Sequence, residues 1–413
     1  MRLLVLSILA TNFLIPGLAA SDRYIVTLSP HVLFDRHKEL LQGILAKAPR
    51  QQRPNQAFDG IFRYYSIPGF QAYAARFDIN VVDQLRRHAD VLAIERDQEF
   101  AIPSTPPEYP NDPECDSDRK EPAHTLQPDA FDLGPAQISH RGTNEKGVYW
   151  YDQSAGQGTY GYVVDSGVNI HHAEFESRAF LGHNAVENAP FRDDEGHGTH
   201  VASTVCGKTY GVAKKCNIIA VKIAHGGKSS RALLLDGYTW AVKDILDKRR
   251  QSKAVINISW SLPGPSAAHD HAVNAAFAKG VTTVVAAGNS KQHAGLTWPT
   301  SAGSAIVVAA STCTRKSAGF SNYGPNVTLF APGTYVRGAW IGFTGNSNTA
   351  TAWLSGTSMA APHVSGLVLY FKGLGGLASA KATKKYIVKM ATRDVVKNVK
   401  DTPNLFAYNG SGK

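Results

Sequence analysis

Leu-Ser-Gly-Thr-Ser-Met-Ala-Ala-Pro-His-Val occupies residues 354–364, and an apolar run compatible with a helix continues from it to Tyr370. Gly356 permits a tight turn in front of the helix, so the hydroxyl of Ser358 would project from the helix mouth. Backbone N–H groups and the positive end of the helix dipole lie beside such a hydroxyl, where negative charge develops during nucleophilic attack. An N-cap serine is the plainer interpretation of this stretch alone. The rest of the chain decides between the two.

Short apolar strands alternate with amphipathic helices from about residue 130 onward. Strands are expected at residues 160–164, 217–223, 254–258, 281–286 and 305–310. Helices are expected at residues 197–205, 233–246, 268–278, 358–374 and 379–392. Continuous Val, Ile and Ala strands between helices are typical of a mostly parallel sheet covered on both faces. The pattern therefore predicts an α/β fold with functional side chains at the carboxyl ends of its strands.

Two polar residues stand where this fold places functional groups. Asp165 follows the strand at 160–164, and His197 begins the next helix. Taken singly, Asp165 suits any strand-ending turn, and His197 with His200 is a pattern that a metal-dependent hydrolase could use. No Glu-x-x-His pattern and no zinc-type cysteine spacing accompanies the two histidines, so we expect no metal site there.

Three motifs occur together in one order along the chain. Asp165 comes first, His197 second and Ser358 third, which is the order of the subtilisin triad and differs from those of chymotrypsin and the α/β-hydrolases. Residues 163–167, 197–202 and 356–364 resemble the three signatures of the subtilisin superfamily, peptidase family S8. Residues 154–158, 210–215, 320–324 and 405–409 are similar to its proteinase K branch, typical of secreted fungal enzymes. The resemblance spans about residues 130–410.

The resemblance assigns a role to four residues. Ser358 would be the nucleophile, His197 the general base, and Asp165 the carboxylate that holds the imidazole tautomer. Asn289 matches the asparagine of the oxyanion hole, where its amide would act with the Ser358 N–H. The implied function is a serine endopeptidase that hydrolyses peptide bonds through an acyl-enzyme intermediate. The alternative is a catalytically silent homologue that binds peptides in the same cleft.

Two segments are expected to line the substrate. They contain Ser259, Trp260 and Ser261, and Ala286, Ala287 and Gly288. The family usually reads Asn-x-Ser-Leu-Gly-Gly in the first segment, whereas residues 257–264 read Asn-Ile-Ser-Trp-Ser-Leu-Pro-Gly. The register set by Asn257 and Ser259 replaces two glycines by Ser261 and Leu262, and a register shifted by two aligns residues 261–264 instead. In both registers the segment lacks a glycine that would let a substrate strand approach closely. We therefore expect a preference for substrate side chains that is narrower than, or altered from, the broad apolar preference of the branch.

A calcium site of the proteinase K branch, made of backbone carbonyls and an aspartate, is also altered. The aspartate position holds Thr328, and the usual Pro and Val positions hold Gly303 and Ala305. A threonine supplies no charge to a hard cation. We expect this calcium site to be absent or weak, and no cofactor to be required.

Residues 1–20 have the form of a secretory signal peptide. Arg2 precedes an apolar stretch at 3–15, and small residues at Gly17 and Ala19 fit a cleavage site. No later apolar run is long enough to span a bilayer. We therefore expect a secreted, extracellular protein without a membrane anchor.

An exported chain can carry disulfides and glycans. The four cysteines are Cys115, Cys206, Cys216 and Cys313. They allow three complete pairings, among which a bridge across the turn between Cys206 and Cys216 is reasonable. Asn326 and Asn409 are glycosylation candidates because each begins an Asn-x-Ser/Thr pattern in a loop-like stretch.

Residues 21–102 form a separate unit by their pattern. Strand and helix signals follow a β-α-β-β-α-β order, which is the ferredoxin-like arrangement. This unit resembles the inhibitory propeptide of these proteases, in which residues 91–100 would form the closing strand and the exit tail. The alternative is that the unit is an independent binding module. Residues 103–127 are a Pro-rich linker with a processing region, and residues 128–413 would form the catalytic domain.

Composition excludes other functions. The chain has 413 residues, of which 43% are hydrophobic, enough for two or three folded units. Its net charge is +10, but Lys and Arg are scattered and their longest cluster is residues 248–250. We expect no nucleic-acid and no membrane partner. We expect the chain to be a monomer. Its expected partners are protein and peptide substrates and its own propeptide.

Overall fold

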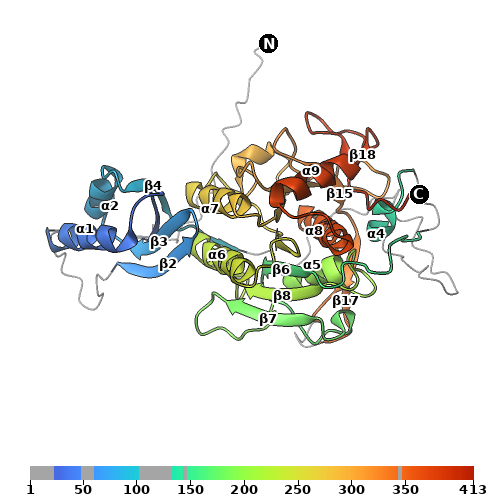
Figure 1. Cartoon of the computed structure of the whole chain (residues 1–413), viewed down its shortest axis with the longest axis horizontal. Helices are drawn as coiled ribbons and strands as arrows, with labels where there is room; N and C mark the ends of the chain where they lie inside the picture. The colour runs from blue at the N-terminus through green and yellow to red at the C-terminus, as the bar shows by residue number, and fades with distance from the viewer. Residues whose placement is uncertain (1–22, 48–59, 102–132, 143–146, 343–346) are drawn as a thin grey trace, which may run out of the picture.

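A computed structural model describes residues 23–47, 60–101, 133–142, 147–342 and 347–413. The predicted signal peptide and the predicted linker at 103–127 lie outside these residues. The described residues contain a four-stranded sheet, a nine-stranded sheet and three two-stranded pairs. Figure 1 shows the four-stranded sheet with its helices at one end of the molecule, beside a larger body built on the nine-stranded sheet.

The smaller unit has the predicted β-α-β-β-α-β order. Its elements are β1 (Arg23–Leu28), α1 (Phe34–Lys47), β2 (Ile61–Ile67), β3 (Phe70–Arg76), α2 (Ile79–Arg86) and β4 (Val91–Arg96). The strands are antiparallel and lie in the order β2-β3-β1-β4, as in the ferredoxin-like arrangement.

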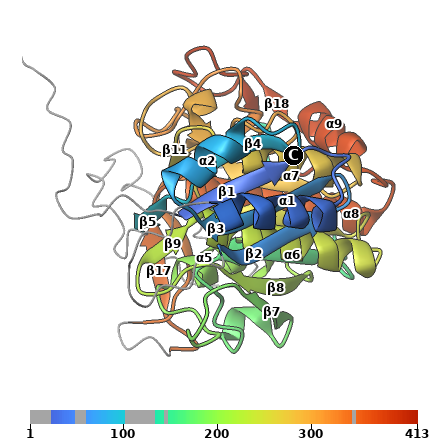
Figure 2. The same cartoon turned by 90° about the vertical axis from the view of Figure 1, so that its left-hand side faces the viewer.

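The central strands of the small sheet, β1 and β3, are buried on both faces. Neighbouring strand residues point to opposite sides, so Val26 enters a core shared with α1 and α2 while Ile25 enters the core of the larger body. Figure 2 shows the sheet lying across α6 (Arg231–Asp247) and α7 (Ala267–Ala278). The smaller unit is therefore docked on the larger one through one whole face of its sheet.

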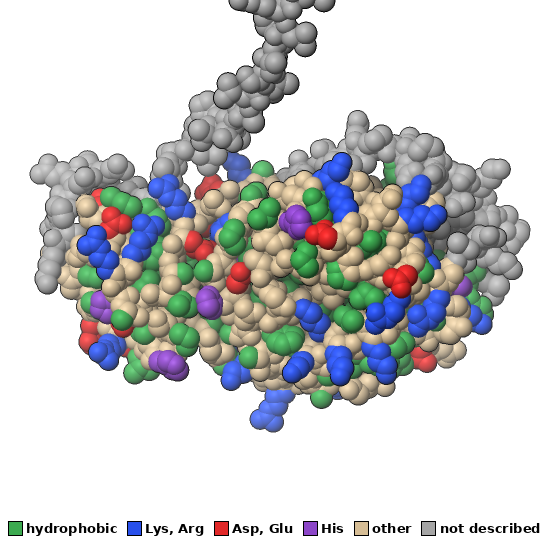
Figure 3. All heavy atoms as spheres, turned by 90° about the horizontal axis from the view of Figure 1, so that it is seen from above, with side chains coloured by type: hydrophobic (Ala, Val, Ile, Leu, Met, Phe, Trp, Pro, Cys, Tyr) green, Lys and Arg blue, Asp and Glu red, His purple; other side chains and the backbone are tan. Residues whose placement is uncertain are grey.

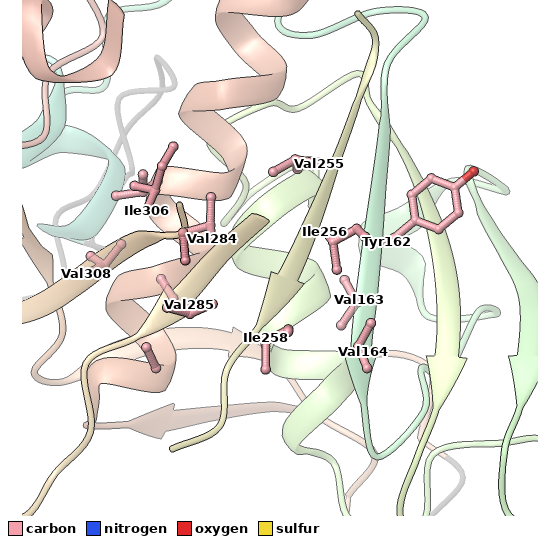
Figure 4. Packing of buried hydrophobic residues seen from close by; sticks show 14 of the residues in the cluster. Tyr162, Val163, Val164, Val255, Ile256, Ile258, Val284, Val285, Ile306 and Val308 are labelled. Carbon is pink, nitrogen blue, oxygen red and sulfur yellow. The ribbon is translucent and has the colours of Figure 1, made fainter. Parts of the chain in front are cut away.

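The nine-stranded sheet forms the centre of the larger body. Its order is β18-β19-β15-β14-β12-β10-β6-β8-β7, and neighbours are parallel except β18 with β19. The strands are β6 (Tyr160–Asp165), β7 (Ala179–Asn184), β8 (Asn217–Lys222), β10 (Ala254–Ile258), β12 (Thr283–Ala286), β14 (Ile306–Ser311), β15 (Leu329–Pro332), β18 (Thr392–Arg393) and β19 (Leu405–Phe406). Every residue of β10, β12 and β14 is buried, and Figure 4 shows their apolar side chains packed with those of β6. The α/β prediction is confirmed.

Helices and short strand pairs complete the body. The remaining helices are α4 (Leu133–Ile138), η1 (Ala173–Phe175), α5 (His197–Cys206), η2 (Ala294–Leu296), α8 (Thr357–Leu374) and α9 (Ala380–Met390). The short pairs are β5 (Glu99–Ala101) with β9 (Lys228–Ser230), β11 (Leu262–Pro263) with β13 (Thr297–Trp298), and β16 (Val336–Ala339) with β17 (Thr351–Leu354). Among the helices of the described residues, none is long and apolar enough to cross a membrane. Lys and Arg side chains are scattered among other types on the face in Figure 3.

Candidate active site

Asp165 and His197 meet at the carboxyl end of β6. Asp165 is the last residue of β6 and is completely buried, and His197 is the first residue of α5. The Nδ1 atom of His197 lies 2.8 Å from Oδ1 of Asp165. A side chain on Gly198 would collide with the carbonyl oxygen of Gly167, 2.0 Å from an ideal Cβ, so glycine lets α5 start directly against the turn after β6.

This contact fixes the tautomer of His197. A carboxylate only accepts hydrogen bonds, so Nδ1 carries the proton and Nε2 keeps its lone pair. Burial alone lowers the pKa of His197, but the charge and hydrogen bond of Asp165, with Asp193 and Glu195 nearby, raise it above its ordinary value. The arrangement is that of a positioned general base.

Ser358 is the second residue of α8, one turn before a proline inside that helix. Its hydroxyl donates to the carbonyl oxygen of Ser259 at 2.8 Å. Pro362 has no N–H for the carbonyl of Ser358, and the Ser259 hydroxyl donates to that carbonyl at 2.9 Å instead. Within the described residues no hydrogen bond joins Ser358 to His197, so its hydroxyl is turned toward Ser259 in this structure.

Asn289 follows β12 and lies beside the start of α8. Its Oδ1 accepts the backbone N–H of Thr357 at 2.9 Å and the Thr357 hydroxyl at 2.8 Å. Since an N–H only donates, this atom is the amide oxygen, and the NH₂ group lies on the other side of the amide. Nδ2 lies 3.3 Å from an ideal Cβ on Gly356, in the turn before Ser358. The N–H of Ser358, in the first turn of α8, has no partner within the helix, so two donors are available side by side.

The two predicted substrate segments face each other. An ideal Cβ on Gly288 would lie 2.5 Å from Oγ of Ser261, so segment 286–288 contacts segment 259–261 at this glycine. Ala286 and Ala287 are buried beneath it. Leu262 and Pro263, which follow, are tied down as β11 against β13. The stretch that departs from the family pattern is thus an ordered wall beside Ser358.

Trp260 has a contact that the sequence did not predict. Its indole Nε1 donates to Oδ2 of Asp165 at 3.1 Å, and its ring centre lies 5.4 Å from that of His197. The indole is almost completely buried. The side chain therefore faces the Asp165–His197 pair, in a segment predicted only to line the substrate.

Strand β5, which follows the smaller unit along the chain, reaches the same edge. β5 pairs antiparallel with β9 of the larger body, and the ring centre of Phe100 lies 5.8 Å from that of Trp260. Asp97, just before β5, accepts the N–H of Ala232 at 2.9 Å, near the start of α6. Glu95 accepts from the hydroxyl of Ser266, the N-cap of α7. Sequence reasoning missed these two carboxylates at helix N-termini, a favourable place for negative charge.

The predicted calcium position does not fit a calcium ion. Nζ of Lys384 donates to the carbonyl oxygens of Gly303 at 2.9 Å and Ala305 at 2.7 Å. The hydroxyl of Thr328 accepts the N–H of Val307 at 3.1 Å. A lysine ammonium thus takes the carbonyls that calcium would need, and Thr328 supplies no charge to a cation.

The other predicted positions have different outcomes. His200 is buried with Nε2 3.1 Å from the carbonyl of Val336, and no cluster of three or more His, Cys, Asp or Glu side chains suited to a metal occurs in the described part of the chain. Asn409 is buried and its Nδ2 donates to the carbonyl of Trp150 at 2.6 Å, which argues against a glycan there. Asn326 is exposed.

The cysteine pairing is partly described. Cys206 and Cys216 form the disulfide that their spacing suggested. Cys313 is also disulfide-bonded, and Cys115 lies outside the described residues.

Comparison with known proteins agrees with this geometry. Residues 156–409 match the model of the subtilase family, and residues 23–102 match that of the peptidase inhibitor I9 family. Alkaline protease 1 of a strain of Aspergillus flavus is 46% identical over 352 residues, covering 85% of this chain and 81% of that protein. Alkaline proteinase of Hapsidospora chrysogena is 41% identical over 392 residues, covering 95% of this chain and 92% of that protein.

A solved structure gives the same result. The crystal structure of a cold adapted subtilisin-like serine proteinase matches with a TM-score of 0.62 and 32% identity, covering 67% of this chain and 97% of that one. Two family models, two relatives and one fold thus point the same way. The chain belongs to the subtilase family and is a subtilisin-like serine protease made with an I9-type inhibitory propeptide.

Proposed function

We propose that the chain is a secreted serine endopeptidase in which Asp165, His197 and Ser358 are the catalytic triad. The observation that carries this proposal is the 2.8 Å contact between Asp165 and His197, which leaves Nε2 of His197 as a base at the edge where α8 starts with Thr357 and Ser358. The Ser358 hydroxyl turns from the Ser259 carbonyl to Nε2 and attacks the scissile carbonyl carbon as its proton passes to His197.

Asn289 completes the proposed chemistry. Its Nδ2 and the Ser358 N–H donate to the oxygen of the tetrahedral intermediate, while Asp165 stabilises the imidazolium of His197. The imidazolium passes its proton to the leaving amine, and the acyl group stays on Ser358. A water molecule then repeats the sequence and releases the acid.

Mass spectrometry of the secreted wild type and of Ser358→Ala tests this function. We expect the wild type to lose its N-terminal segment up to a point between residues 100 and 127, while Ser358→Ala keeps it. Processing of both forms would mean that another protease matures the chain, and labelling of Ser358 by a serine-directed fluorophosphonate would then be required. Absence of both processing and labelling would establish the alternative, a catalytically silent peptide-binding homologue.

We further propose the route by which the chain is made and released. Residues 1–20 direct secretion and are removed, and residues 21–102 act as the propeptide. The chain is cut in the linker at residues 103–127, and residues 128–413 form the catalytic domain of a monomeric enzyme. The pairing of β5 with β9 supports this route, because an exit strand added to β9 occupies an edge that an extended substrate needs. Asn326, which is exposed, is the remaining glycosylation candidate. Nucleic acids and membranes are not proposed partners.

Substrate preference follows from the wall beside Ser358. We propose that Ser259, Trp260 and Ser261 on one side and Ala286, Ala287 and Gly288 on the other contact the substrate, with a preference narrower than, or altered from, a broad apolar one. Trp260 would do so through its backbone, because its indole faces Asp165 and His197. The Ser261 hydroxyl against Gly288 supports this, because it takes space that glycine would leave to the substrate. Cleavage of a mixed peptide library by the mature enzyme tests it, and an unselective apolar profile would contradict it.

No metal is proposed as a cofactor. Lys384 already supplies a cation to the carbonyls of Gly303 and Ala305, which supports a protease that does not need calcium at this position.

A further inference from the structure

A buried carboxylate requires a hydrogen-bond donor at each oxygen, because water does not reach it. Oδ1 of Asp165 accepts the N–H of Ser166 at 2.8 Å and faces Nδ1 of His197 at 2.8 Å. Oδ2 accepts the indole N–H of Trp260 at 3.1 Å, and the described residues provide it with no other donor. Trp260 therefore satisfies the half of the carboxylate that does not contact His197.

The indole is suited to this task. It is a donor only, so it cannot turn to accept a hydrogen bond from another group. It is neutral, so it stabilises the carboxylate without placing a positive charge beside the imidazolium that forms during catalysis. Its ring also packs against the His197 ring, with 5.4 Å between centres, so one side chain limits the motion of both partners.

Resting on the proposed function, we propose that Trp260 is a positioning residue of the triad, holding the Asp165 carboxylate in the rotation that presents Oδ1 to His197. The connection runs through the backbone as well, because the preceding residue, Ser259, exchanges hydrogen bonds with Ser358. Residues 259 and 260 thus contact all three members of the proposed triad from the carboxyl end of β10.

The indole N–H acts differently on the two charge states of the Asp165–His197 pair. Asp165 and His197 together carry a net charge of −1 when the imidazole is neutral and 0 when it is protonated. The positive end of the indole N–H dipole stabilises the −1 state more, so it lowers the apparent pKa of the pair. The other charged or titratable groups that act on His197 are Asp193 and Glu195, before α5, and His200 within it. None of them is altered by a change at residue 260.

The chain offers a matched control for removing a single N–H. Trp298 is also buried, and its Nε1 has no hydrogen-bond partner among the described residues. Trp260→Phe and Trp298→Phe therefore remove the same atoms from two buried indoles, but only the first removes a hydrogen bond to Asp165. Both variants are expressed as the full chain and compared after maturation, with active sites counted by a covalent inhibitor.

The measurements are kcat, KM and the acid limb of kcat/KM against pH for one peptide substrate. A lost hydrogen bond to a charged group predicts that Trp260→Phe lowers kcat roughly 10- to 100-fold relative to Trp298→Phe, with KM changed less than about 3-fold. The acid limb of kcat/KM for Trp260→Phe is expected to move to higher pH. A general loosening of the fold would not produce this shift. Equal kcat and equal acid limbs in the two variants would overturn the proposal. Absence of activity in the wild type would instead overturn the proposed function.

Nuclear magnetic resonance of the wild type covers the case in which Trp260→Phe does not mature. Indole N–H resonances are followed from acid to neutral pH in enzyme labelled with ¹⁵N-tryptophan. The Trp260 resonance is expected to shift with the midpoint of the His197 titration. The Trp298 ring centre lies 4.1 Å from that of His269, and the Trp298 resonance is expected not to follow the His197 midpoint. A Trp260 resonance that does not respond to this titration would overturn the proposal without any variant.

Discussion

Lys372 makes the stability of the protein depend on pH in a direction that can be measured. Its side chain is buried near the end of α8, and Nζ donates to the carbonyls of Gln251 at 2.7 Å and Ala254 at 2.8 Å and to the Thr282 hydroxyl at 3.3 Å. No carboxylate forms a salt bridge with it within the described residues. Burial lowers the pKa of Lys372 to about 7, from an ordinary value of 10.5.

The sign follows from proton binding. Between pH 7 and pH 10.5 the unfolded chain holds a proton on this lysine more often than the folded chain does, so the free energy of unfolding increases with pH. Integrating the two titrations gives a gain of about 2 kcal/mol between pH 7 and pH 9. Above about pH 10 the trend reverses, because burial raises the pKa values of Tyr149 and Tyr238 and stability is lost as unfolded tyrosines ionise.

The assay is guanidinium unfolding of the full chain carrying Ser358→Ala, which prevents self-digestion. The midpoint is measured from pH 7 to pH 9.5, with and without the additional change Lys372→Met. Methionine also removes the donor for two carbonyls, which shifts the whole curve down, so the slope is the informative quantity. We expect a rising curve with lysine and a shallower one with methionine, which keeps the contribution of Lys384, whose pKa burial also lowers. A curve with lysine that is flat or falls over this range would show that burial does not lower the pKa of Lys372.

Three other expectations concern the site and its inhibitor. Asn289→Ala should lower kcat by roughly 10²–10³ with little change in KM, measured on matured enzyme, and an unchanged kcat would remove it from the oxyanion hole. Lys384→Met should lower the free energy of unfolding by about 1–3 kcal/mol in the same guanidinium assay, because two carbonyls lose their donor. A chelator should leave the melting temperature of the wild type unchanged. Asp97→Asn in a propeptide added to the mature enzyme, on which its sheet is covered, should weaken inhibition about 5- to 30-fold, because it removes charge from the α6 N-terminus and from the ion pair with Arg23. Asp83→Asn, in an exposed ion pair with Arg86, is the control and should leave inhibition unchanged.

The fold was predictable where the signal is local. Strands such as β10 and β14 are continuous apolar runs because both of their faces are buried, and the helices between them have helical spacing. β7 was missed because it is an edge strand that leaves Phe180 and Leu181 exposed, so its pattern does not resemble that of a central strand.

The candidate site was predictable as a set of residues but not as a set of contacts. Motif order brought Asp165, His197 and Ser358 together, and the structure places them at one edge of the sheet. The indole of Trp260 reaches Asp165 from 95 positions away, and the ammonium of Lys384 reaches Gly303 from 81 positions away. Contacts between residues so far apart in the sequence cannot be predicted from local residue spacing. The burial of Asn409 is equally a tertiary property, which an Asn-x-Ser pattern does not contain.

The small sheet has an apolar face that only the larger body covers, and release of the propeptide would expose this face to water. Once the propeptide leaves, Ile25, Tyr65 and Phe70 and their neighbours on the same face lose the helices that cover them. A sheet with one apolar face exposed to solvent and only a small hydrophobic core on its opposite face has low stability. We therefore expect the freed inhibitor to loosen and become a substrate of the enzyme it restrained. Activation would then be irreversible, because the released propeptide is degraded and cannot inhibit the enzyme again.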